Sequence, residues 1–136
     1  MLSQRAKYTI RAMQELATLK PGETLQAGEL AERTKAPIHF LEGILLEMRR
    51  EGLLQSKRGR SGGYALNKPA DLISIADLIR LIDGPLALTT CASRTAYARC
   101  EDCPTPDDCR LRAVLLAARD AMADVLEKST LTRRAV

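Results

Sequence analysis

Aromatic residues are scarce in this chain. Only 3% of its 136 residues are aromatic and tryptophan is absent, so a core must be built from leucine, isoleucine, valine, alanine and methionine. No segment reaches the ~18 continuous apolar residues of a membrane-spanning helix, and the opening MLSQRAKYTI lacks the apolar run of a signal peptide. These absences predict a cytoplasmic protein with no membrane partner.

Recognisable catalytic motifs are also missing. Residues 59–63 match G-x-S-x-G, the nucleophile turn of α/β-hydrolases, but the single histidine, His39, precedes Ser61 and no acid–histidine pair follows it. No phosphate-binding loop, dinucleotide-binding fingerprint or zinc-protease motif is present. The sequence therefore predicts that the protein is not an enzyme.

The residues that are present describe a small, mildly basic globular protein. Hydrophobic residues make up 46% and charged residues 28%, with a formal net charge of +4. This length favours one compact domain, or a small domain with an appendage. The charge is compatible with nucleic acid binding but is insufficient alone to indicate it.

The hydrophobic periodicity predicts a winged helix-turn-helix. The expected elements are helices over 3–19, 27–33, 37–51, 75–82 and 110–127, with a β-hairpin of 53–57 and 64–66 after the third helix. We predict a mostly α fold with a small β-hairpin wing and a long C-terminal dimerisation helix. The expected division is a DNA-binding domain over 1–68, then a helix, a cysteine loop and the dimerisation helix over 69–136.

The second helix of a helix-turn-helix can enter the major groove of DNA. Its predicted inward face is Leu41, Ile44, Leu45 and Met48, which turns other residues outward. The hairpin tip is basic and glycine-rich, and an arginine there can enter a narrow minor groove. The predicted DNA-binding residues are His39, Phe40, Glu42, Arg49, Arg50, Lys57, Arg58 and Arg60. The alternative is that these basic residues form an ordinary solvated surface.

Apolar residues recur at spacings of three and four along the last helix. The members of this stripe are Leu111, Leu115, Ala118, Met122 and Val125. A stripe of this period requires a partner surface. We predict that a second copy of the chain covers it, which gives a homodimer.

All four cysteines lie in the segment CASRTAYARCEDCPTPDDC, residues 91–109, which we call the cysteine segment. They are Cys91, Cys100, Cys103 and Cys109. The C-x-x-C pair suits one metal ion or cluster, and four cysteines complete the ligand set of zinc or an iron–sulfur cluster. The third possibility, a metal-free thiol switch, is disfavoured by neighbouring acidic residues such as Asp102 and Asp108, which oppose thiolate formation.

The chain resembles the Rrf-two (Rrf2) family of bacterial winged-helix transcriptional regulators, which includes IscR-type, NsrR-type and CymR-type proteins. The resemblance covers nearly the whole sequence. It is carried by the start MLSQRAKYTIRAM, LAERTKAPIHFLEGILLEMRREGLL, the wing KRGRSGGYAL, ISIADLIRLIDGPL and the cysteine segment before the last helix. It implies a homodimer that binds a roughly palindromic double-stranded DNA operator, with Arg58 at the wing-arginine position, and Phe40 and Glu42 at DNA-contacting positions.

The resemblance further implies an iron–sulfur cluster, of the 2Fe-2S or 4Fe-4S type, with zinc as the alternative. Cys91, Cys103 and Cys109 match the family's cluster pattern. The fourth ligand of IscR-type relatives, a histidine, is replaced here by Arg112, and the aspartate of NsrR-type relatives is replaced by Tyr8. Cys100 is the natural substitute. A CymR-type relative acts in complex with a metabolic enzyme, so docking of a protein partner on the cysteine loop stays an alternative.

Overall fold

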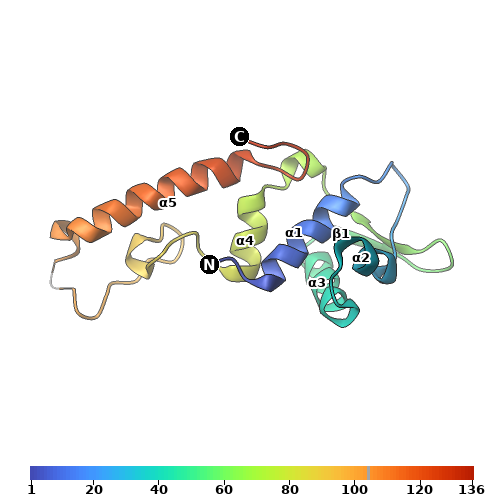
Figure 1. Cartoon of the computed structure of the whole chain (residues 1–136), viewed down its shortest axis with the longest axis horizontal. Helices are drawn as coiled ribbons and strands as arrows, with labels where there is room; N and C mark the ends of the chain where they lie inside the picture. Colours follow the sequence, from blue (N-terminus) through green and yellow to red (C-terminus); the bar gives the residue numbers. More distant parts are fainter. Residues whose placement is uncertain (104) are drawn as a thin grey trace.

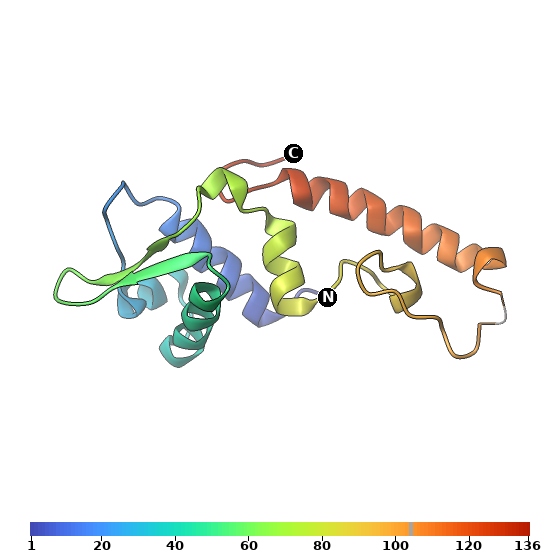
Figure 2. The same ribbon diagram turned by 180° about the vertical axis from the view of Figure 1, so that it is seen from behind.

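The computed structural model describes residues 1–103 and 105–136. Three N-terminal helices and a two-stranded hairpin form one end of the molecule, and a long C-terminal helix extends from it toward the other end (Figure 1). The fourth long helix lies between these parts in both views (Figure 2). The elements are α1 (Gln4–Leu16), α2 (Ala27–Thr34), α3 (Ile38–Arg50), β1 (Leu54–Lys57), β2 (Gly63–Leu66), η1 (Ala70–Leu72), α4 (Ile75–Asp83), η2 (Thr90–Ala92), η3 (Pro106–Asp108) and α5 (Arg110–Lys128).

The inward faces of α1, α2 and α3 form the main core. Met13, Leu30 and Leu41 are fully buried in it, each one at the face that the apolar spacing predicts. Between α2 and α3 the chain turns through Lys35, the only non-glycine residue with a positive φ in the described ranges, at 55°. A left-handed residue at this place ends α2 sharply and allows α3 to begin only three residues later.

The wing consists of β1, β2 and the tip 58–62. Its strands pair antiparallel from Leu54 opposite Leu66 to Lys57 opposite Gly63. The loop before α2 joins the hairpin, because Leu25 and Tyr64 exchange two backbone hydrogen bonds of 3.0 and 2.7 Å. The base of the wing is therefore fixed to the helix-turn-helix, and the tip projects from it (Figure 2).

The chain that follows α5 returns to the first core. Leu131 is buried in the same cluster as Ile73 and Leu78, and its backbone N–H donates to the Ile73 carbonyl at 3.1 Å. Ser74 and Thr130 form a β-bridge beside it. The C-terminal end of α5 is thus anchored directly on the end of the molecule that holds the helix-turn-helix.

The winged-helix fold class is confirmed, with the β-hairpin wing and the long C-terminal helix in their predicted places. The first helix ends at Leu16 rather than at the predicted Leu19. A turn follows at 17–18, ahead of the predicted stop at Pro21-Gly22. The side chain of Ser74 caps α4 by accepting from the Asp77 N–H at 3.0 Å, as its spacing predicts.

The predicted domain boundary between residues 68 and 69 stays a prediction. No helix in 1–103 or 105–136 is long and apolar enough to cross a membrane.

Candidate functional site

The second helix of the helix-turn-helix, α3, presents one face to the surface. Leu41, Ile44, Leu45 and Met48 hold its other face in the core. His39, Phe40 and Glu42 are all exposed near its N-terminal end, and Arg49 and Arg50 are exposed in its last turn. The face predicted to contact DNA is therefore open to solvent along its whole length.

Two contacts fix α3 relative to α1. The Phe40 ring meets the Tyr8 ring edge to face, with centroids 6.1 Å apart. The Arg5 guanidinium forms an ion pair with Glu47 on the next turns of α3. Tyr8 and Arg5 were not among the predicted site residues. Their partners lie far away in sequence, so no local pattern indicates these contacts.

The wing exposes its three predicted basic residues, Lys57, Arg58 and Arg60. Its backbone path is set from outside the hairpin, because the Thr24 hydroxyl donates to the Ser61 carbonyl at 3.0 Å. The position of Ser61 also excludes the G-x-S-x-G match as a nucleophile turn. Ser61 is an exposed residue of a hairpin tip and does not lie on a strand-to-helix turn.

An apolar stripe on α5 faces solvent, and it differs slightly from the predicted one. Leu111 and Val114 are each 64% exposed, while Met122 and Val125 are 41% and 40% exposed. Leu115 is half-buried, so Val114 takes its place on the outer face. The α5 stripe, as defined by the structure, is Leu111, Val114, Ala118, Met122 and Val125. A second copy of the chain is still a prediction.

The cysteine segment runs beside α5 and brings its cysteines to different depths (Figure 1). Cys91 is buried in η2, while Cys100, Cys103 and Cys109 are half-buried. Cys109 is the N-cap residue of α5, where its Sγ accepts from the Arg112 N–H at 3.4 Å. The Arg99 guanidinium donates twice to the Cys103 carbonyl, at 2.8 and 3.1 Å, which supports the C-x-x-C turn.

Local contacts separate the pKa values of two cysteines. The pKa of Cys91 is lowered, chiefly by a hydrogen bond with the Thr89 hydroxyl 3.1 Å away, and further by the Cys100 thiol and the positive charge of Arg112. The pKa of Cys100 is raised by Cys91, by burial, and by charges that include Asp102. The acidic neighbours therefore oppose a thiolate at Cys100, as predicted, but not at Cys91.

The donor chemistry of the segment fits a thiolate-ligated metal. Four thiols are available, and soft thiolate ligands suit zinc and iron–sulfur clusters. The structure brings Cys91 and Cys100 near one another, with Cys103 within electrostatic range of Cys100. Throughout the described part of the chain, no three cysteine, histidine, aspartate or glutamate side chains converge on one point as metal ligands do.

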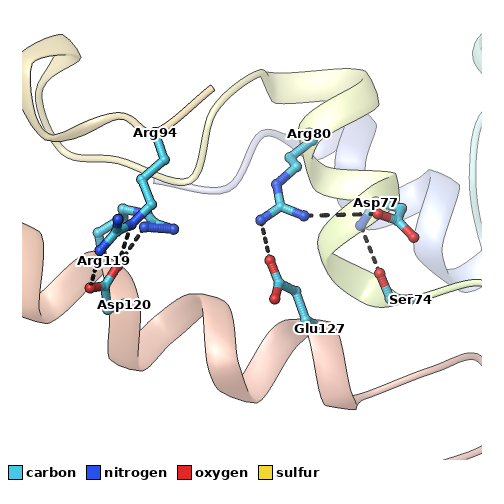
Figure 3. A network of polar contacts seen from close by, with 7 residues as sticks. All are labelled: Ser74, Asp77, Arg80, Arg94, Arg119, Asp120 and Glu127. Carbon is cyan, nitrogen blue, oxygen red and sulfur yellow. Dashed lines mark hydrogen bonds and ion pairs between the residues drawn. The ribbon is translucent and has the colours of Figure 1, made fainter. Parts of the chain in front are cut away.

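Arginine contacts join α5 to the segments packed against it (Figure 3). Arg94, three residues after Cys91, forms a two-pronged pair with Asp120 at 3.0 and 2.7 Å, and Arg119 contacts the same carboxylate. Closer to the C-terminal end of α5, Arg80 of α4 pairs with Glu127. Both the cysteine segment and α4 are therefore held on one side of α5, away from its exposed stripe.

Comparison with known proteins identifies the family of this chain. Residues 2–133 match the model of Rrf2, described as an iron-dependent transcriptional regulator. The chain belongs to the Rrf2 family. It is therefore a transcriptional regulator, and members of the family are DNA-binding regulators and not enzymes.

Individual relatives agree with this assignment. An rrf2-like HTH-type transcriptional regulator of Rhodobacter capsulatus is 45% identical over 117 residues, which cover 84% of this chain and 78% of the relative. CymR, the global cysteine regulator of B. subtilis, matches with a TM-score of 0.78 and 29% identity over 96% of this chain and 92% of that one. IscR of T. potens matches with a TM-score of 0.73 over 96% of this chain and 82% of that one, and at 23% identity it supports the fold alone.

Proposed function

We propose that this Rrf2 protein is a cytoplasmic, homodimeric regulator whose operator affinity is set by an iron–sulfur cluster on Cys91, Cys100, Cys103 and Cys109. The observation that carries the proposal is the position of the cysteine segment. All four thiols of the chain lie in one segment that contacts α5 through Arg94 and Asp120. The iron-dependence of the matched family favours iron over zinc.

The cysteines supply a complete thiolate ligand set without help from Arg112 or Tyr8. The cluster would supply a redox-sensitive crosslink between Cys91, which is buried beside α5, and the more exposed C-x-x-C turn. A cluster held by these four thiols would tie Cys91 to Cys100, Cys103 and Cys109 and so order the cysteine segment. A change of that kind is what a sensor needs.

The signal reaches the DNA-binding end through α5. The cysteine segment contacts one end and the middle of this helix, while the opposite end is joined to the core by Leu131. If the α5 stripes of two protomers pack together, a rearranged cysteine segment changes the relative position of the two recognition helices. Helix-turn-helix dimers read half-sites about one DNA turn apart, so this change alters affinity.

Metal content tests the cluster directly. The protein is purified without oxygen, and its visible spectrum is recorded together with iron, sulfide and zinc analysis. We expect a brown protein with matching iron and sulfide. A colourless protein with one zinc per chain would replace the cluster by a structural zinc site, and protein without either metal would leave the thiol switch.

The DNA interface is tested at the wing. Arg58→Ala removes a cation from the exposed tip, so we expect weaker specific binding and a smaller dependence of affinity on salt, by about one ion per protomer. Lys68→Ala, an exposed cation beyond the end of β2, is the control and should have a smaller effect. Unchanged affinity and salt dependence in Arg58→Ala would contradict the minor-groove role of the wing.

A further inference from the structure

The side chain of Arg112 makes several contacts with the cysteine segment. It lies in the first turn of α5, and its side chain is only 23% exposed. Its Nε donates to the Cys91 carbonyl at 3.0 Å. The guanidinium carbon lies 5.8 Å from the centre of the Tyr97 ring, within the range of a cation–π contact. One guanidinium thus meets both the first cysteine and the loop that follows it.

Arg112 also contacts the other end of the segment. Its Nη1 lies 3.7 Å from Asp107, and its backbone N–H donates to the Sγ of Cys109 at 3.4 Å. Cys91 and Cys109 are the first and last cysteines of the segment, so Arg112 joins the two ends of the loop. Closing a flexible loop of this length carries an entropic cost, which a fixed contact between the ends removes from any later binding step.

We propose that Arg112 is a positioning residue for the cysteine site, which holds Cys91 and Cys109 together at the start of α5 before any metal binds. This inference rests on the proposed function for the identity of the site, while the contacts that carry it involve only residues of this chain. In this arrangement Cys91 and Cys109 both contact Arg112 directly, in the first turn of α5.

Both the planar shape and the positive charge of the Arg112 guanidinium contribute to this role. Arginine presents several N–H donors in one plane, so it can donate to a carbonyl while its face lies over a ring. A lysine ammonium keeps the charge but has no planar fork. The positive charge adds a second contribution, because a site made of four thiolates is net negative when it holds zinc or a cluster.

Hydrogen–deuterium exchange of the metal-free protein tests the positioning role. We expect Arg112→Gln to speed amide exchange over residues 91–98 by about tenfold, because it removes a charge-assisted hydrogen bond and a ring contact. Arg112→Lys should show a similar loss, which separates the fork from the charge. Arg110→Gln is the matched control: its exposed side chain makes no hydrogen bond or ion pair within the described ranges, and exchange should stay at the wild-type rate.

Titration with Co²⁺, a spectroscopic probe of thiolate sites, gives the second readout. We expect the thiolate-to-cobalt absorption of wild-type protein and Arg110→Gln to develop at the same metal concentration, and Arg112→Gln to need about ten times more. Wild-type exchange in Arg112→Gln would overturn the positioning role whatever the metal result. Faster exchange in a protein that binds no cobalt would keep the positioning role and count against the proposed metal site.

Discussion

Gly63 occupies the place where the wing backbone passes against the loop before α2. Its φ is 148°, and a Cβ built there would lie 2.6 Å from the Leu25 carbonyl oxygen. That distance is well inside contact, and the neighbour is backbone that is itself hydrogen-bonded to Tyr64. Gly63, the second of the two adjacent glycines in the wing, is therefore required by packing at the base of the hairpin.

Replacing this glycine tests that explanation. Gly63→Ala should lower the free energy of unfolding by about 2 kcal/mol, because backbone strain and a steric clash act together. Urea denaturation measures the loss. Gly59→Ala is the control, since Gly59 also has a positive φ but its added Cβ meets nothing within 4 Å. Equal losses in the two variants would show that φ alone matters and that the approach to Leu25 does not.

Ser3 and Asp83 join the start of α1 to the end of α4. The Ser3 hydroxyl accepts from the Ala6 N–H at 3.0 Å and donates to Asp83, whose carboxylate also accepts from the Ser3 N–H at 2.8 Å. These bonds, the side-chain one first, lower the pKa of Asp83. The contact lies just before the chain enters the cysteine segment.

A lowered carboxyl pKa in the folded state predicts a defined pH dependence. The stabilisation by Asp83 is present above the unfolded pKa of about 3.9 and is lost as the pH falls through the lower folded value. The difference in unfolding free energy between wild type and Asp83→Asn should therefore be constant above about pH 5 and shrink as the pH falls through the folded pKa of Asp83. Denaturation at several pH values measures this difference. A constant difference would mean that the carboxylate charge is not what Ser3 stabilises.

At the scale of secondary structure, the local hydrophobic periodicity correctly predicted which face of α3 is buried. The stripe Leu41, Ile44, Leu45 and Met48 is buried as its 3.6-residue spacing requires. The cysteine segment has no such periodicity, so its path depends on contacts that only the folded chain provides, such as Arg94 with Asp120 and Arg112 with the Cys91 carbonyl. The identity of the candidate ligands could be read from the sequence, while their arrangement could not.

The same reasoning applies to the last helix. Its period was clear from the sequence, but two neighbouring registers of apolar residues fit it, and packing against α4 and η2 decides between them. The structure places Val114 outside and Leu115 half inside. This choice fixes which residues a second protomer would meet.

The α5 stripe predicts the effect of a buried charge on assembly. Val114→Glu and Val125→Glu each place a carboxylate in the proposed dimer contact, which costs several kcal/mol when the charge is unpaired. We expect these variants to sediment as 14.9 kDa monomers and the wild type at twice that mass. Ala113→Glu, an exposed position on another face of α5, should stay dimeric. A dimeric Val114→Glu would place the contact elsewhere.

At the scale of the whole molecule, α5 connects the two ends. The chain returns from its C-terminal end through Leu131 into the core of α1, α3 and α4, and Arg80 pairs with Glu127 nearby. The cysteine segment is attached at the opposite end through Arg112 and in the middle through Arg94. A rigid helix with these attachments can carry a rearrangement of the cysteines to the recognition helix.

The most direct test of cluster-controlled DNA binding compares the affinity of one DNA duplex for the cluster-loaded protein and for the protein stripped of metal. A duplex selected by the protein from a random-sequence library is titrated, without oxygen and at fixed salt, with cluster-loaded protein and with protein stripped of metal. We expect the dissociation constants of the two forms to differ by roughly fivefold or more, the range of an allosteric coupling. Equal dissociation constants for the two forms would contradict it.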